Sequence, residues 1–133
     1  MNIHRCYPLR NLILGAVLTV GFASSALAQE LRAVLVDLNS KEVTNLGTLG
    51  GDLSYASGIN DLGQVVGTSS TDKGQRHAFI TGPNGAGMTD LGTLGGDFSY
   101  PNGINDAGQV VGQNGNGYAF ITGPDGMGML DLN

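Results

Sequence analysis

Apolar residues between positions 53 and 91 fall into short runs that are separated by clusters of Gly, Asn, Asp and Pro. Short runs rich in β-branched and aromatic residues are typical of β-strands, and the clusters between them are typical of turns. The pattern predicts four strands, at residues 53–59, 64–69, 77–81 and 88–91. The sequence therefore predicts an all-β protein.

The same pattern recurs along the chain. The motif LGTLGGD at residues 46–52 reappears at 91–97, after 45 residues. The motif AFITGP at 78–83 reappears at 119–124, after only 41 residues, so one predicted hairpin loop is four residues shorter in the second copy. An even deletion in a hairpin loop keeps every side chain on its own face of the sheet.

A partial copy precedes the two full ones. RAVL at residues 32–35 aligns without a gap on HAFI at 77–80, so the first copy consists of the third and fourth strands alone. We predict a partial repeat at 29–47, a first full repeat at 48–92 and a second full repeat at 93–133.

Four short strands in about 45 residues make one blade of a β-propeller. We therefore predict tandem four-stranded antiparallel repeats that are propeller-blade-like and incomplete, at two and a half copies. Continuous apolar runs such as 78–80 indicate stacked sheets with both faces buried, because a strand wetted on one face alternates. Pro101 lies in a predicted first strand, which places that strand at a sheet edge. A β-sandwich or a solenoid-like stack is the alternative architecture.

The first 28 residues differ in pattern from the repeats. Arg5 and Arg10 precede an apolar run at 12–20, and small residues follow and end at Ala28. This layout is typical of a secretory signal peptide, and it predicts cleavage between Ala28 and Gln29. The run is shorter than the roughly 20 apolar residues of a membrane-spanning helix. We expect the processed chain to be secreted or periplasmic, with no attachment to a membrane.

Removal of this segment changes the composition of the chain. Subtracting 28 residues from 133 leaves 105, and the one cysteine, Cys6, is lost, so the processed chain forms no disulfide. Loss of Arg5 and Arg10 changes the formal net charge from −5 to −7. This acidic balance argues against nucleic acid or an anionic membrane as a partner.

The repeat motifs resemble those of a known family. DLGTLGGD at 90–97, GIND at 103–106, GQVVG at 108–112 and HAF at 77–79 are similar to the HAF family of extracellular repeats. The resemblance covers essentially all of the processed chain. It implies an exported bacterial protein with a propeller-like fold, often with more copies than this one, and it implies no established activity.

No group of residues predicts a catalytic, cofactor-binding or metal site. The processed chain has one histidine, His77, and its aligned positions hold Arg32 and Tyr118, which cannot act as the same general base. The glycine-rich stretch 82–87 departs from G-x-G-x-x-G and predicts a hairpin turn.

Four aspartates recur in the predicted loops. They are Asp52, Asp61, Asp97 and Asp106. Oxygen-rich loops can bind calcium, but the spacing here departs from both the EF-hand and the nonapeptide calcium repeat. We interpret these aspartates as side-chain-capped turns, with a calcium-binding extracellular module as the alternative.

The sequence favours an exported non-enzymatic repeat protein that serves as a surface or envelope interaction module. The alternatives are a truncated relic of a longer repeat protein and, less favoured by the lack of ligands and nucleophiles, a propeller-type enzyme. The predicted partner is a second copy or another repeat protein, because stacked repeats bury their apolar faces only against each other.

Overall fold

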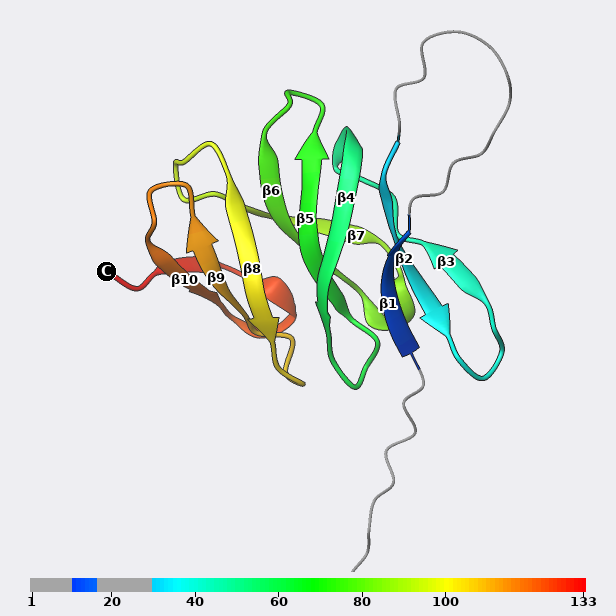
Figure 1. Cartoon of the computed structure of the whole chain (residues 1–133). Helices are drawn as coiled ribbons and strands as arrows, with labels where there is room; N and C mark the ends of the chain where they lie inside the picture. The colour runs from blue at the N-terminus through cyan, green and yellow to red at the C-terminus, as the bar shows by residue number, and fades with distance from the viewer. Residues whose placement is uncertain (1–10, 17–29) are drawn as a thin grey trace, which may run out of the picture.

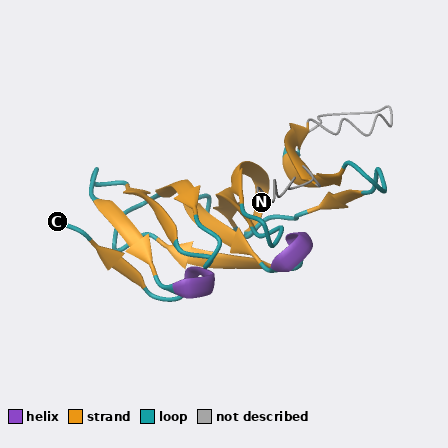
Figure 2. Ribbon diagram, turned by 90° about the horizontal axis from the view of Figure 1, so that it is seen from below, coloured by secondary structure: helices purple, strands orange, loops and turns teal. Residues whose placement is uncertain are grey.

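The structure is a computed structural model that describes residues 11–16 and 30–133. Apart from two single-turn segments, Pro83–Gly85 (η1) and Pro124–Gly126 (η2), the regular structure of these residues is β-strand (Figure 2). The predicted all-β class is confirmed.

The strands form three antiparallel sheets. The first sheet has the order β1-β2-β3 and contains β1 (Asn11–Ala16), β2 (Arg32–Asp37) and β3 (Val43–Asn45). The central sheet has the order β4-β5-β6-β7 and contains β4 (Gly50–Ile59), β5 (Val65–Thr71), β6 (Arg76–Thr81) and β7 (Met88–Gly92). The last sheet has the order β11-β10-β9-β8 and contains β8 (Ser99–Ile104), β9 (Val110–Asn114), β10 (Ala119–Thr122) and β11 (Met129–Asp131).

The three sheets follow one another in chain order, with the C-terminal sheet at one end (Figure 1). Two apolar cores fill the spaces between them. The buried residues of the first core are Ala33, Leu35, Leu46, Val65 and Phe79. The buried residues of the second core are Val66, Ala78, Ile80, Leu91, Val110 and Phe120. The central sheet therefore contributes to both cores.

This position explains the continuous apolar runs of the central sheet. Side chains alternate between the two faces of a strand. Val65 packs in the first core and Val66 in the second, and Phe79 and Ile80 divide in the same way. Where β5 and β6 lie between the two cores, consecutive residues are therefore apolar, which accounts for the runs at 65–66 and 78–80.

Two buried serines connect neighbouring sheets. Ser54 Oγ of β4 accepts a hydrogen bond from Ala33 N–H of β2 at 2.8 Å and donates to the Gly47 carbonyl at 2.6 Å. Ser99 Oγ of β8 accepts from Ala78 N–H of β6 at 2.8 Å. A small hydroxyl on β4 and on β8 therefore binds the backbone of the preceding sheet.

The first strands lie at sheet edges. In the last sheet β8 is the edge strand, and Pro101 is paired with Gly112 of β9 just before a shift in register. Proline has no N–H to donate, so an edge is where a sheet tolerates it.

Strand β1 consists of residues that belong to the predicted signal peptide. It pairs antiparallel with β2, from Asn11 opposite Asp37 to Ala16 opposite Arg32. In the central sheet the equivalent of β2 is β6, which is paired with β5. Strand β1 therefore lies beside β2 as β5 lies beside β6. The predicted cleavage point between Ala28 and Gln29 lies outside the described residues.

Candidate functional site

The outward face of the last sheet is apolar, and no sheet among the described residues packs against it. It carries the counterparts of four residues that the second core buries in the central sheet. Those buried residues are Val66, Ala78, Ile80 and Leu91. Their counterparts are Val111, Ala119, Ile121 and Leu132. We call this surface, made of Val111, Ala119, Ile121 and Leu132, the open face.

The open face differs from its counterpart in burial and not in residue type. Val66 has no exposed surface, whereas Val111 is 43% exposed. Leu91 is 8% exposed, whereas Leu132 is 55% exposed. The central sheet is covered on this side by the last sheet, and no described residue covers the last sheet in the same way.

Alternation along the last two hairpin strands produces this face. In β9 the side chain of Val110 is buried in the second core, so that of Val111 points to the opposite side. In β10 the same relation holds between buried Phe120 and half-buried Ile121. Consecutive apolar residues in β9 and β10 are therefore buried on one face of the sheet alone.

A backbone donor on this sheet also lacks the partner that its counterparts have. Ala33 N–H and Ala78 N–H each donate to a serine hydroxyl of the following sheet. Ala119 occupies the same repeat position, and within residues 30–133 no serine hydroxyl accepts from its N–H. In the first two sheets, such apolar side chains and such an N–H group contact the sheet that follows. The open face presents the same apolar side chains and the same N–H group.

His77 contacts the carboxylate at the first position of the DLGTLGGD motif. Its Nδ1 lies 2.8 Å and 3.0 Å from the two carboxylate oxygens of Asp90, on the neighbouring strand β7. Asp90 Oδ1 also accepts from Gly92 N–H at 2.7 Å. Ser69, paired with His77 across β5 and β6, binds the backbone of Leu49 through its hydroxyl. The described contacts of His77 join β6 to β7.

The turn role of Asp90 is common to the last strands of all three sheets. Asn45 Oδ1 accepts from Gly47 N–H at 2.9 Å, and Asp131 Oδ1 accepts from Asn133 N–H at 2.9 Å. A carboxylate or amide oxygen at this position therefore caps the end of the fourth strand. The repeat alignment of these three positions is the signal that could have identified Asp90.

The predicted aspartate loops separate into two groups. Asp106 Oδ1 accepts from Asp61 N–H at 3.1 Å, which joins the turn after β4 to the turn after β8. Asp52 lies in strand β4 and not in a loop as the sequence predicted, and Asp97 lies just before β8 and lines a cleft described below. Within the described residues, no three His, Cys, Asp or Glu side chains gather to hold a metal ion.

The glycine-rich stretch 82–87 connects β6 to β7 as a hairpin turn. Its Gly85 has φ of +73° and packs against the first core, where an added Cβ would lie 2.8 Å from Leu46. Glycine is required here both by the left-handed backbone and by the close approach.

No family model, curated protein or solved structure matches this chain. The resemblance to HAF repeats rests on the motifs described above. Within residues 11–16 and 30–133, no helix is long and apolar enough to cross a membrane.

Proposed function

We propose that this chain is an exported, non-enzymatic repeat protein that acts as an interaction module through the open face. Its two four-stranded sheets are propeller-blade-like repeats in this proposal, and the first sheet is a partial one. The shared strand order, the repeated serine contacts and the HAF-like motifs support the repeat architecture.

One observation carries the functional part of the proposal. The residues that bind the next repeat in the central sheet occur again in the last sheet, where Val111 is 43% exposed. Contiguous apolar surface of this kind marks interaction sites on soluble domains. The partner that matches it is a repeat sheet of a second copy or of another repeat protein.

The expected affinity is modest. Full burial of a Val, Leu or Ile side chain contributes about 1.5–3 kcal/mol. Val111, Ile121 and Leu132 are already partly covered, so each contributes less than this. Association itself costs about 4–15 kcal/mol in lost rigid-body freedom. Each of the three side chains should therefore be necessary for binding.

We expect the processed chain to self-associate, and we expect the double variant Val111→Lys with Leu132→Lys to be monomeric. A lysine ammonium on each of two exposed positions cannot be buried in an apolar interface without a large desolvation cost. Sedimentation velocity at several micromolar concentrations measures the change.

The matched control is Leu62→Lys, because Leu62 is also an exposed leucine but lies in the turn between β4 and β5. This control should associate like the unmodified chain. A monomeric unmodified chain, or equal dissociation by Leu62→Lys, would contradict the proposed role of the open face.

Export makes a separate prediction. Expression with the native N-terminus in a Gram-negative host should yield a chain whose intact mass begins at Gln29. Removal of the preceding residues also removes β1 and leaves the edge of β2 open. Recovery of the exported protein with Met1 to Ala28 still attached would refute the predicted processing.

A further inference from the structure

A shallow cleft of about 280 Å³ lies between the β5–β6 hairpin of the central sheet and strand β8 of the last sheet. Its position is away from the open face, on the side where β8 is an edge strand. The cleft is lined by Lys73, Gly74, Gln75, Arg76, Asp97, Phe98 and Tyr100.

The residues of the cleft depart from the repeat. Arg76 and Phe98 are joined by an isolated parallel bridge, and the equivalent bridge between the first and central sheets joins Leu31 to Leu53. The aligned residue in the last sheet is Gly117. Because leucine or glycine serves the fold at the same place, the backbone does not require the guanidinium of Arg76.

The loop that closes one side of the cleft is also shorter in the second copy. The hairpin between β5 and β6 contains Lys73, whereas the hairpin between β9 and β10 is four residues shorter. The cleft therefore combines two features that are absent at the aligned positions. One is a longer, basic hairpin between β5 and β6, and the other is a phenylalanine just before β8.

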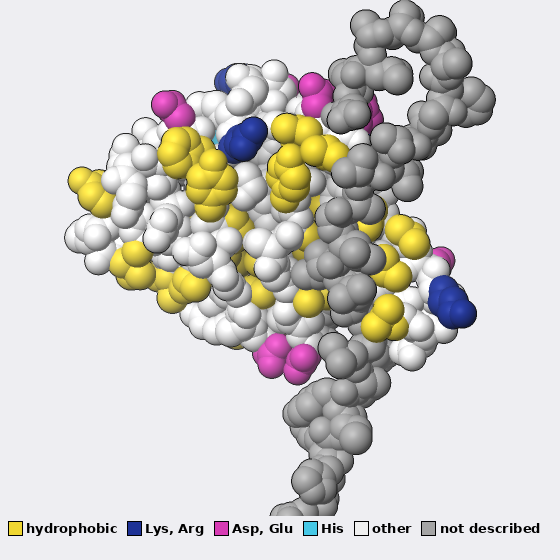
Figure 3. All heavy atoms as spheres, in the orientation of Figure 1, with side chains coloured by type: hydrophobic (Ala, Val, Ile, Leu, Met, Phe, Trp, Pro, Cys, Tyr) yellow, Lys and Arg dark blue, Asp and Glu magenta, His cyan; other side chains and the backbone are white. Residues whose placement is uncertain are grey.

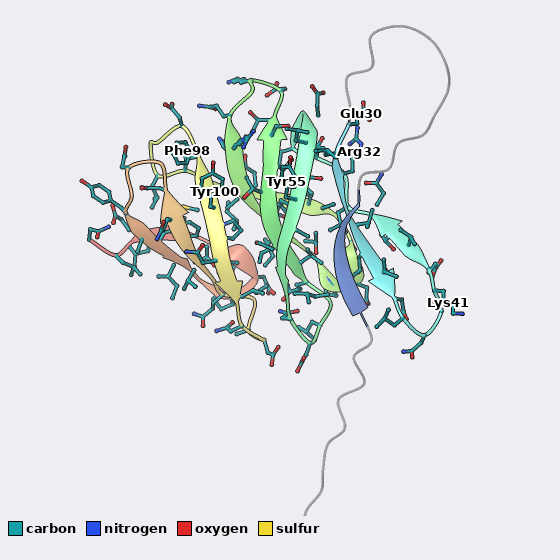
Figure 4. The ribbon with its side chains drawn as sticks, viewed as in Figure 1. Glu30, Arg32, Lys41, Tyr55, Phe98 and Tyr100 are labelled. Carbon is teal, nitrogen blue, oxygen red and sulfur yellow. The ribbon has the colours of Figure 1, made fainter. Side chains whose placement is uncertain are left out.

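Two aromatic rings form an exposed platform at this cleft. Phe98 and Tyr100 have ring centroids 5.2 Å apart and an interplanar angle of 46°, and each residue is 38% exposed. Both project from the β8 region, and Tyr55 projects from β4 at the position that aligns with Tyr100 (Figure 4). The space-filling view shows this apolar group over β8 beside a basic side chain (Figure 3).

The charged groups of the cleft are not paired with each other. The side chains of Lys73 and Arg76 form no ion pair or hydrogen bond with any described residue. They are two of the four basic residues that follow Ala28, in a chain with eleven acidic residues. Asp97 lines the same cleft and forms no ion pair with either of them.

We propose that this cleft binds a saccharide that carries a carboxylate group, such as a uronic acid in a polysaccharide. The apolar C–H face of a sugar ring fits an exposed aromatic ring. The guanidinium of Arg76 matches a carboxylate in a bidentate pair, and Lys73 adds a second positive charge. Gln75 and Asp97 provide amide and carboxylate partners for hydroxyl groups.

Asp97 distinguishes this ligand from other anions. A carboxylate accepts hydrogen bonds and repels a second anion, so a free phosphate or an acidic peptide would meet an unfavourable charge there. A sugar acid supplies hydroxyl donors for Asp97 and an anion for Arg76 on the same ring. The mixed charge of the cleft therefore favours an acidic sugar.

Binding should be weak and sensitive to salt. A volume of about 280 Å³ is at the lower limit for ligand pockets, and the cleft is open to solvent. We expect a Kd of about 0.1–1 mM for a short oligosaccharide. Because Lys73 and Arg76 are exposed, raising the ionic strength should weaken binding.

Titration of the processed full chain with trigalacturonate, followed by ¹H–¹⁵N NMR, tests this proposal. The amide signals of Gln75, Asp97 and Tyr100 should shift together. Arg76→Gln and Phe98→Ala should each weaken binding at least tenfold, whereas Phe98→Tyr should retain it. Retained dispersion of the amide spectrum shows that each variant is folded.

Matched controls separate the cleft from general charge and from exposed aromatic surface. Lys41→Gln removes an exposed cation elsewhere, and Tyr118→Ala removes an exposed ring elsewhere, so neither should change the Kd. The double variant Val111→Lys with Leu132→Lys should also bind normally, which distinguishes this proposal from that for the open face. Maltotriose and triglutamate should bind at least tenfold more weakly than trigalacturonate.

Three results would overturn the assignment. They are equal binding of triglutamate, equal binding of maltotriose, and an unchanged affinity in Arg76→Gln. The first would indicate an acidic peptide, the second a neutral sugar on the aromatic rings, and the third a site elsewhere on the chain.

Discussion

Replacement of Gly67 by alanine is expected to destabilise the central sheet severely. Gly67 lies in the middle of β5, where an added Cβ would overlap the Tyr55 carbonyl of β4 and lie 2.8 Å from the ring of Phe79. Neither neighbour can move freely, because one is strand backbone and the other is a ring with no exposed surface. We expect a loss of about 3 kcal/mol or more in the free energy of unfolding, at or beyond the upper end of ordinary overpacking.

Chemical denaturation of the processed chain measures this loss. Gly103→Ala is the matched control, because its added Cβ would meet only Val111, at an ordinary distance of 3.7 Å. The control should differ from the unmodified chain by about 0.5 kcal/mol or less. Similar unfolding midpoints for Gly67→Ala and Gly103→Ala would show that β4 and β6 do not pack as closely as described.

Truncation of Phe79 to alanine is expected to cost about 3–5 kcal/mol, the usual range for a buried phenylalanine. The Phe79 side chain fills the first core between β2 and the central sheet, together with Leu35 and Val65. Truncation leaves a cavity that strands held by backbone hydrogen bonds can close only in part. A domain of this size has a total stability of about 5–15 kcal/mol, so this truncation should remove a large part of it.

Tyr118→Ala provides the comparison for Phe79→Ala, because Tyr118 is 47% exposed and lies outside both cores. Its effect on the unfolding free energy should be about 0.5 kcal/mol or less. The same experiment on Phe120→Ala examines the second core. A cost below about 1 kcal/mol for Phe79→Ala would mean that the first sheet does not pack on the central one.

Local signals were sufficient to locate most strands. Runs at 53–59, 64–69, 77–81 and 88–91 correspond to β4, β5, β6 and β7, which differ from them by a few residues at the ends. The ends differ because pairing decides them. Strand β4 begins at Gly50 since that residue pairs with Thr71 across a shifted register.

Apart from Asp97, which the sequence placed in a loop, neither the residues of the proposed cleft nor the partner of His77 could be identified from the sequence. Asp90 is 13 residues from His77, and Phe98 is 22 residues from Arg76. Those contacts depend on how β6 pairs with β7 and on how the last sheet lies against the central one. The available signal for the cleft was a departure from the repeat, because position 76 holds arginine where the other copies have leucine and glycine.

For the predicted signal peptide, the sequence of the segment and its pairing with β2 determine different properties. Composition alone predicts an export signal over the first 28 residues, because charge, apolar length and small residues are properties of the segment itself. That Asn11–Ala16 also has the register of a second strand against β2 is a property of the pair. Cleavage between Ala28 and Gln29 would remove β1, so this pairing belongs to the unprocessed chain alone.

The sequence by itself determined the all-β class and the positions of the turns, because these follow from side-chain alternation and from the backbone preferences of Gly, Asn, Asp and Pro. It could not distinguish Val66 from Val111, which occupy the same motif and have the same neighbours along the chain. One is buried and the other is exposed because a following sheet covers the first and no described residue covers the second. Burial is a property of what packs against a strand, and that is decided by tertiary structure.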